Sequence, residues 1–461
     1  MAEGEPDRQG DVPPPGSHVS VAGPGWVRAR LRRVLQQVRL VPSGDGALDW
    51  KSPAALNMGA AAVRSLSRSV WGLFVPTVLP VVGYGVYSLL QTTAAVLSQI
   101  AILGTPQTLL RQPGRKLPIA GLFLHSLLIA CIVLPVFLLR STVGGWYDVL
   151  VAAMAVTLIA YGILAARAKA VNAFAGVFRA EAVGALALLL GWGVLLFTQH
   201  WRGTHDAGYT TVAALEIGAT LVVVLSLVLP QSTKITRPEV RLAGTAAVLP
   251  SVYSVGILVL LDLLVFRRLE MYFLELSPDG LQGVAVFGLG AQFAGLFLLF
   301  PTAMLEAAMP ALATSFASTW HEFDARFNAN RQTYRRVFAV VVVTSVLGPP
   351  LLVRFVFTHY APWTWYIMAF AAIRVVCGYA GVYSSALYVV RRERWMYLPA
   401  LLGALVALGS NSLLTVRWGL RGAVLAFALT QATVTIAALL AFRGATPSMR
   451  RDAGGPTSGL A

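Results

Sequence analysis

Charged side chains are scarce in this chain. Only 12% of its 461 residues are Asp, Glu, Lys or Arg, whereas a soluble globular protein carries about 25%. Hydrophobic residues make up 57% of the chain, and the mean hydropathy is +0.69. So little charge excludes a surface that faces water throughout. The composition therefore predicts an all-α integral membrane protein.

Cysteine and histidine are also rare. The two cysteines, Cys131 and Cys377, both lie inside apolar runs, which excludes a disulfide framework and a paired metal-ligand spacing. The six histidines are scattered, and the sequence contains no glycine-rich phosphate loop and no Ser/His/Asp set. The predicted outside loops are short, unlike those of membrane-embedded transferases. We therefore expect a protein that is not an enzyme and has no metal and no cofactor.

Basic residues outnumber acidic ones and give a formal net charge of +16. They lie between the apolar runs rather than in one patch, which argues against nucleic acid as a partner. Alternate loops hold most of them, for example Arg326, Arg331, Arg335 and Arg336 in a single loop. The positive-inside rule then predicts a multi-pass protein of the bacterial inner membrane with both termini in the cytoplasm.

The apolar runs predict about twelve transmembrane helices, because a bilayer core of about 30 Å needs roughly 20 apolar residues per helix. They lie near 54–76, 84–104, 118–139, 148–166, 180–199, 210–230, 244–266, 281–304, 337–357, 364–390, 397–415 and 421–442. We expect four parts: a basic cytoplasmic tail (1–52), an N-lobe (53–230), a C-lobe (231–446) and a cytoplasmic tail (447–461). Residues 26–40 are either an interfacial helix or a frayed basic segment. Residues 306–336 are expected to form a cytoplasmic loop that contains a surface helix.

An internal repeat links the two halves of the chain. Gly83-Tyr84-Gly85-Val86-Tyr87-Ser88-Leu89 opens the second span, and Gly283-Val284-Ala285-Val286-Phe287-Gly288-Leu289 opens the eighth. Each copy starts the second helix of a half. This placement predicts two pseudo-symmetric six-helix lobes, which is a common plan of secondary transporters.

Ionisable residues inside the spans are the candidate functional residues. A charge at bilayer depth costs about 2.5–3.5 kcal/mol on insertion scales, so such residues normally face a cavity. Arg64 and Arg68 lie one turn apart on span one, and Arg374 lies in span ten. Arginines grouped in this way suit phosphate or pyrophosphate. Glu216 in span six and Asp262 in span seven are candidate ion-coupling or structural residues.

Several of these residues allow a second interpretation. Arg64 could extend to the cytoplasmic interface from a short first helix. Glu216 could form a structural ion pair with an arginine instead of binding a coupling ion. Asp262 could pair with Arg267 or Arg268 at the outer interface.

Three stretches carry a resemblance to a known family. They are Leu79 to Ser88 running on to Ala101-Ile102-Leu103-Gly104, Glu270 to Asp279 followed by Gly283 to Leu289 and Pro301 to Pro310, and Arg417 to Ala426. In order and spacing they resemble the polysaccharide (Wzx-like) flippase branch of the multidrug/oligosaccharidyl-lipid/polysaccharide (MOP) exporter superfamily. The Ser67-Arg68 pair resembles a Ser-Arg pair in the first helix of the related lipid II flippase.

The resemblance implies two six-helix lobes around a central cavity. It also implies export of an undecaprenyl-pyrophosphate-linked oligosaccharide from the inner to the outer leaflet, for polysaccharide biosynthesis. The expected partners are this lipid-linked oligosaccharide, membrane lipids and polysaccharide-synthesis enzymes. Two alternatives stay open: a MATE-like antiporter of small molecules or drugs, and a non-transporting scaffold of a polysaccharide-synthesis complex.

Overall fold

The structure is a computed structural model of the whole chain. It describes residues 53–106, 109, 119–138, 145–170, 173–202, 208–228, 249, 252–253, 256, 269–390, 392 and 394–453, all within one compact unit. The expected interfacial segment 26–40, most of the seventh span and Asp262 lie outside these residues. The described residues are almost entirely helical, as the composition predicts.

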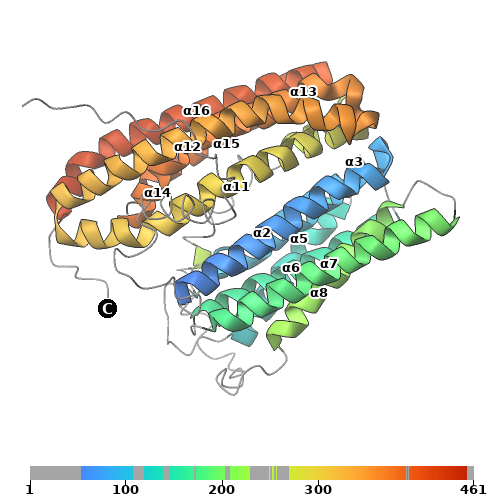
Figure 1. The fold of residues 1–461 in the computed structure, drawn as a ribbon, viewed down its shortest axis with the longest axis horizontal. Coiled ribbons are helices and arrows are strands. Elements are labelled where there is room, and N and C mark those ends of the chain that lie inside the picture. Colours follow the sequence, from blue (N-terminus) through green and yellow to red (C-terminus); the bar gives the residue numbers. More distant parts are fainter. Residues whose placement is uncertain are drawn as a thin grey trace, which may run out of the picture. The chain divides into compact units, whose positions relative to one another are not determined.

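Six helices precede residue 230, and their positions agree with the first six predicted spans. They are α2 (Pro53–Val78), α3 (Val81–Ile102), α5 (Ile119–Leu138), α6 (Trp146–Ala170), α7 (Phe174–Arg202) and α8 (Tyr209–Val228). Helix α7 packs against α2 and α8, and α6 packs against α3 and α8 (Figure 1). We call these six helices the N-terminal group.

The remaining helices form the C-terminal group. They are α10 (Leu269–Glu275), α11 (Gly280–Ser318), α12 (Trp320–Phe355), the 3-10 helix η2 (Thr358–Trp363), α13 (Thr364–Gly378), α14 (Gly381–Val389), α15 (Arg394–Ser410), the π-helical turn η3 (Asn411–Thr415) and α16 (Val416–Asp452). Helix α11 packs against α12 and α13, and α16 packs against α13 and α15.

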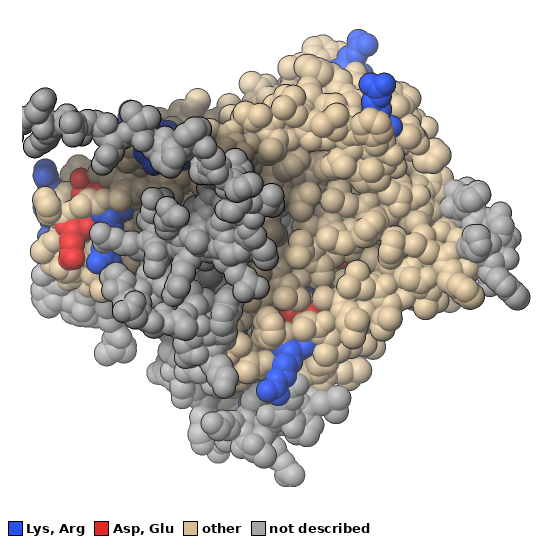
Figure 2. Space-filling model, viewed as in Figure 1, with Lys and Arg blue, Asp and Glu red and all other residues tan. Residues whose placement is uncertain are grey.

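Eight helical stretches in the described part of the chain are long and apolar enough to cross a membrane. Helix α2 is not among them, because Arg64 and Arg68 lower its hydropathy. Large apolar side chains such as Leu190, Phe197 and Leu351 are exposed, as expected for helices that face lipid. Figure 2 shows the same property, since most of the visible described surface carries no charge. The fold is therefore an all-α integral membrane fold.

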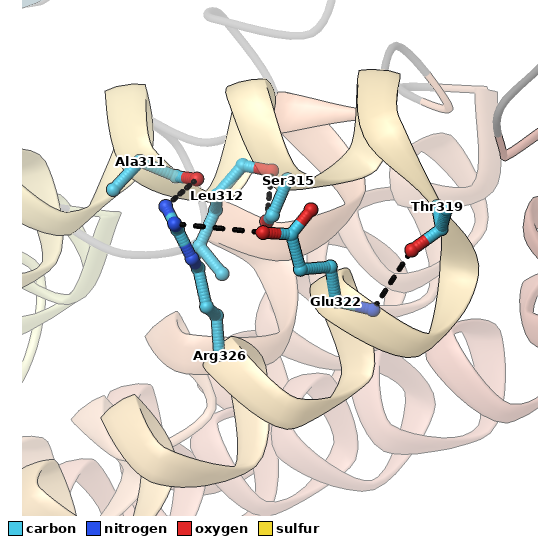
Figure 3. A network of polar contacts seen from close by, with 6 residues as sticks. All are labelled: Ala311, Leu312, Ser315, Thr319, Glu322 and Arg326. Carbon is cyan, nitrogen blue, oxygen red and sulfur yellow. Dashed lines mark hydrogen bonds and ion pairs between the residues drawn. The ribbon is translucent and has the colours of Figure 1, made fainter.

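The stretch 306–336 is helical almost throughout, rather than a loop that contains one surface helix. Helices α11 and α12 continue through this stretch and meet at Thr319, whose hydroxyl accepts a hydrogen bond from the Glu322 N–H at 3.2 Å (Figure 3). Arg326 donates to the Ala311 carbonyl at 3.2 Å and lies 3.8 Å from Glu322. A hydropathy average misses this hairpin because α12 is amphipathic here. Its buried face consists of Phe323, Phe327, Tyr334 and Phe338, at helical spacing.

The tenth predicted span, 364–390, is also not one continuous helix. It breaks at Tyr379 and Ala380 into α13 and α14. Glycines flank the break, Gly378 on one side and Gly381 on the other, and glycine is among the weakest helix formers.

The two copies of the internal repeat pack against each other. Helices α3 and α11 are in contact, and a Cβ atom built on Gly85 would lie 2.1 Å from the Leu281 carbonyl oxygen. A Cβ atom on Gly288 would lie 2.8 Å from the Ser88 hydroxyl. Ser88 and Gly288 hold equivalent places in the two copies. The repeat therefore marks the contact between the N-terminal and C-terminal groups, where small residues let two helices approach closely.

A kink near the start of α16 depends on Gly419. This residue has φ 54° and ψ −133°, and the Asp279 carboxylate accepts a hydrogen bond from the N–H of the next residue, Leu420, at 2.6 Å. A Cβ atom on Gly419 would lie inside the contact distance of the same Asp279 oxygen. A side chain here is therefore excluded by both the backbone conformation and the space available.

We expect Gly419→Ala to lower the thermal unfolding temperature in detergent by several degrees. The backbone strain alone corresponds to about 1–3 kcal/mol. Fluorescence-detected size-exclusion chromatography after heating measures the shift. Gly409→Ala in α15 is the matched control, because no atom lies within 4 Å of the added Cβ. Equal unfolding temperatures for the two variants would contradict the role of Gly419.

Candidate functional site

A cavity of about 710 Å³ lies between the N-terminal and C-terminal groups. Helices α2, α3, α11, α13 and α16 contribute its walls. Its polar lining includes Arg64, Arg68, Gln91, Gln292 and Arg374, together with the serines Ser65, Ser69 and Ser88. We call this space the central cavity.

The central cavity lies toward one end of the helices. Helices α2 and α3 form a hairpin that turns at Leu79 and Pro80, and Trp71 donates a hydrogen bond to the Tyr87 hydroxyl across it at 2.9 Å. The close contact of α3 with α11 lies near that turn. The cavity walls come instead from the middle of α2, residues 61–69, and from α11 from Phe287 onward. The space between the two groups is thus closed at the hairpin end.

Three phenylalanines form an apolar part of the cavity wall. Phe287, Phe370 and Phe427 come from α11, α13 and α16, and their ring centroids lie 4.8–5.9 Å apart in edge-to-face arrangements. Such aromatic pairs pack rigidly. The cavity therefore combines a fixed apolar wall with polar and cationic side chains, which suits a ligand with both properties.

The structure brings Arg64, Arg68 and Arg374 to the same cavity. The first two lie on the face of α2 that also holds Ala61, Ser65 and Ser69. These small neighbours leave the arginine side chains room to reach the cavity. Their role in substrate binding stays a prediction, and their environments differ.

Arg64 is held by the N-terminal group. Its guanidinium carbon lies 4.5 Å from the centre of the Tyr161 ring, which is a cation–π contact. The Tyr161 hydroxyl donates a hydrogen bond to the buried Glu181 carboxylate on α7. Part of the Arg64 charge is therefore compensated inside the protein.

Arg374 is held by the C-terminal group. It donates a hydrogen bond to the Gln431 side-chain oxygen on α16 at 3.2 Å. The Glu270 carboxyl group, which is fully buried at the start of α10, lies within range of the Arg374 charge. Arg374 is thus also positioned and partly neutralised by its neighbours.

Arg68 differs from the other two arginines. It is half-buried and lines the central cavity, and it forms no ion pair or hydrogen bond with any side chain in the described part of the chain. A guanidinium in a partly dehydrated cavity without an acceptor favours an anionic ligand. Arg68 is therefore the strongest candidate for direct ligand binding.

Glu216 lies in a hydrogen-bonded network inside the N-terminal group. The Tyr87 hydroxyl donates to its carboxylate at 2.5 Å, and the Gln91 amide donates to its two oxygens at 2.9 and 2.8 Å. Both donors are uncharged. Among the described residues Glu216 therefore does not form the structural ion pair with an arginine that was one of the two interpretations from sequence. Gln91 also lines the cavity and connects this network to it.

Sequence reasoning missed the polar cluster around Glu270. Both oxygens of this carboxyl group, and the amide nitrogen of Gln431, are buried without a hydrogen-bond partner among the described residues. Asn411 lies near Glu270 at the start of the π-helical turn η3, and such turns are frequent at functional sites. The signal available was a single glutamate directly after the apolar seventh span. It gave no indication that Arg374 would be nearby.

Comparison with known proteins gives matches among solved structures. No protein-family model matches the chain, and no curated protein matches it. Twenty-one chains of solved structures match, and eight of them share 14–16% identity with this chain. One is the inward-facing conformation of a multidrug resistance MATE family transporter of the MOP superfamily, with 16% identity, a TM-score of 0.57, and 90% of this chain and 99% of that chain covered.

Two further structures extend the comparison. The outward-facing conformation of a multidrug resistance MATE family transporter has 15% identity and a TM-score of 0.57, with 91% of this chain and 99% of that chain covered. A MOP superfamily transporter from Pyrococcus furiosus, whose reverse polarity of binding pocket suggests a different function, has 14% identity and a TM-score of 0.58, with 90% and 96% covered. At these identities the comparisons establish the fold: the chain has the all-helical membrane fold of the MATE transporters of the MOP superfamily.

Proposed function

We propose that this protein is a flippase that moves an undecaprenyl-pyrophosphate-linked oligosaccharide from the inner to the outer leaflet of the bacterial inner membrane. The observation that carries the proposal is the charge of the central cavity. Its described lining residues include three arginines and no Asp or Glu. Guanidinium groups bind phosphate oxygens with two parallel hydrogen bonds, so the cavity suits a pyrophosphate.

The cavity also offers space and surface for more than the pyrophosphate. Ser65, Ser69, Gln91 and Gln292 can hydrogen-bond sugar hydroxyls, and the phenylalanine wall can pack against the faces of sugar rings. The long lipid tail would stay in the bilayer. A MOP superfamily transporter with this fold has a pocket of reversed polarity that suggests a different function. Pocket charge is therefore a useful criterion for substrate class.

Alternating access is the mechanism that fits this arrangement. Transporters with the same fold are known in inward-facing and outward-facing conformations. Here the α3–α11 contact closes the hairpin end, and the cavity lies on the other side of this contact, against the middle of α2 and the part of α11 that follows Phe287. With the predicted cytoplasmic N-terminus, the cavity faces the inner leaflet, from which the substrate would load. Separation of α3 from α11 would then open the outer side.

A leaflet-exchange assay tests the proposal. The full-length protein is placed in liposomes with an undecaprenyl-pyrophosphate oligosaccharide that carries a fluorophore on its sugar, and dithionite quenches only the outer-leaflet label. We expect the inner-leaflet fraction to become accessible at least tenfold faster than in protein-free liposomes. Exchange at the protein-free rate, with the protein correctly folded and inserted, would contradict the flippase function.

A cation-coupled antiporter of small molecules is the second candidate. Two observations favour it: buried carboxyl groups lie in both groups of helices, Glu181 and Glu216 in the N-terminal group and Glu270 in the C-terminal group, and two similar structures are of multidrug MATE transporters. The cationic cavity argues against cationic drugs as cargo. Uptake of a cationic dye driven by a proton or sodium gradient, together with no lipid exchange, would support this candidate. If neither activity is detected, the remaining candidate is a non-transporting scaffold of a polysaccharide-synthesis complex.

A further inference from the structure

A second cationic pocket lies in the C-terminal group, separate from the central cavity. Its volume is about 480 Å³, and it shares no lining residue with the central cavity. Helix α12 contributes Asn328, Arg331, Gln332 and Arg335, and the break between α13 and α14 contributes Tyr379 and Tyr383. We call it the α12 pocket.

The residues of α12 that line this pocket share one helical face. Positions 328, 331, 332 and 335 are separated by three and four residues, so their side chains are neighbours along the helix. Two like charges at this spacing repel each other by about 0.2–0.5 kcal/mol. A bound anion would remove this repulsion.

The two tyrosines are held in place by aromatic packing. The Tyr379 ring lies 5.7 Å from Tyr334 and 5.5 Å from Phe338, measured between ring centroids. The Tyr383 ring lies 5.3 Å from Phe442. Both rings are half-buried and both line the pocket, where their hydroxyl groups can donate hydrogen bonds.

The arginines of the α12 pocket have no anionic partner in the described part of the chain, although Arg331 lies 6.0 Å from the centre of the Phe327 ring. Arg331 and Arg335 are exposed and form no ion pair or hydrogen bond with a described residue, and the described lining contains no acidic side chain. Arg326, on the same helix, shows the contrast: it contacts both Glu322 and the Ala311 carbonyl (Figure 3). The charge of the pocket is therefore not neutralised by the surrounding described residues.

The position of the pocket along α12 indicates which anion can reach it. The charged part of the helix ends at Arg336, and an apolar run with exposed Val340, Val343 and Leu347 follows. Such a transition marks the boundary between lipid headgroups and the hydrocarbon core, where tyrosine is enriched. The predicted topology places this boundary on the cytoplasmic side. Phospholipid phosphates lie at this depth.

We propose that the α12 pocket binds the phosphate headgroup of an anionic phospholipid of the adjoining leaflet. Arg331 and Arg335 hold the phosphate oxygens, and the Tyr379 and Tyr383 hydroxyls with the Asn328 and Gln332 amides contribute hydrogen bonds. The acyl chains extend along the apolar run of α12. Basic pockets between transmembrane helices on this side of a membrane suit such headgroups. The proposal does not depend on the flippase function.

Thermal unfolding of the full-length protein with defined lipids tests this site. Purified protein is titrated in detergent with phosphatidylglycerol or phosphatidylcholine, and the unfolding temperature is followed. We expect only phosphatidylglycerol to raise it. Arg331→Gln with Arg335→Gln should weaken the apparent affinity roughly fivefold for each arginine, or about thirtyfold together. Glutamine keeps most of the side-chain length and the helix propensity, so folding should be preserved.

Arg336→Gln is the matched control, because it removes the same charge from the neighbouring position outside the pocket. We expect it to retain the wild-type affinity. Native mass spectrometry provides a second readout: the double variant should lose one bound phosphatidylglycerol. An unchanged affinity in the double variant, or an equal loss in Arg336→Gln, would overturn the site. Stabilisation by inorganic phosphate alone would overturn the assignment to a lipid.

Discussion

Arg68→Gln is expected to reduce lipid-linked oligosaccharide exchange at least tenfold while the protein remains folded and abundant. Arg68 lines the central cavity without an ion pair or hydrogen bond to a described residue. Its charge is therefore not neutralised by an internal ion pair and can interact with the pyrophosphate. Hydrogen bonds to charged groups contribute about 1.5–3 kcal/mol, which corresponds to a change of roughly 10- to 150-fold. The leaflet-exchange assay in liposomes measures the effect.

The other cavity arginines provide a graded comparison. Arg64 contacts Tyr161, and Arg374 donates to Gln431, so replacing either should lower the unfolding temperature as well as transport. Arg68→Lys should retain part of the activity, because it keeps the charge but loses the paired geometry of the guanidinium. Arg336→Gln removes the same charge far from the cavity lining and should have no effect on exchange.

These measurements test the cationic site and the flippase function separately. Active wild-type protein together with fully active, normally abundant Arg68→Gln would exclude the cationic site but leave the flippase function in place. An inactive wild type would contradict the function itself. If Arg68→Gln does not accumulate in the membrane, Arg68→Lys is measured instead, because it preserves the positive charge in α2.

A disulfide between positions 88 and 288 is expected to stop transport completely. A Cβ atom on Gly288 would lie 3.2 Å from the Ser88 Cβ atom, a few tenths of an ångström short of the 3.5–4.5 Å that disulfides require. Ser88→Cys with Gly288→Cys should therefore cross-link on mild oxidation. The bond would join α3 to α11 and prevent the separation that opens the outer side. Exchange should fall to the protein-free rate and return after reduction.

The chain offers a matched control for this cross-link. A Cβ atom on Gly184 in α7 would lie 3.7 Å from the Val223 Cβ atom in α8, so Gly184→Cys with Val223→Cys should form a disulfide inside the N-terminal group. This bond joins helices that move together and should leave exchange unchanged. Both pairs are tested with Cys131 and Cys377 replaced by alanine. Undiminished exchange in a fully cross-linked 88–288 protein would exclude alternating access through this contact.

Some features of the fold were local enough to predict from the sequence. Apolar runs of the length of a bilayer gave the positions of α2 to α8, because hydropathy depends only on neighbouring residues. The internal repeat predicted two related halves, and its copies open α3 and α11. The same reasoning missed how far α11 and α12 extend into 306–336. The buried face of α12 there is a narrow stripe beside many charges, and an average over the window hides it.

For the candidate site, too, the sequence predicted some features and only the tertiary structure showed the others. The sequence by itself identified Arg64, Arg68, Arg374 and Glu216, since an ionisable residue inside an apolar run carries a cost that only a cavity or a partner can offset. Only the tertiary structure determined which side chains surround each of these residues. Arg64 meets Tyr161, Arg374 meets Gln431 near Glu270, and Glu216 meets Tyr87. These partners are far apart along the chain, and only the packing of helices against one another brings their side chains within reach.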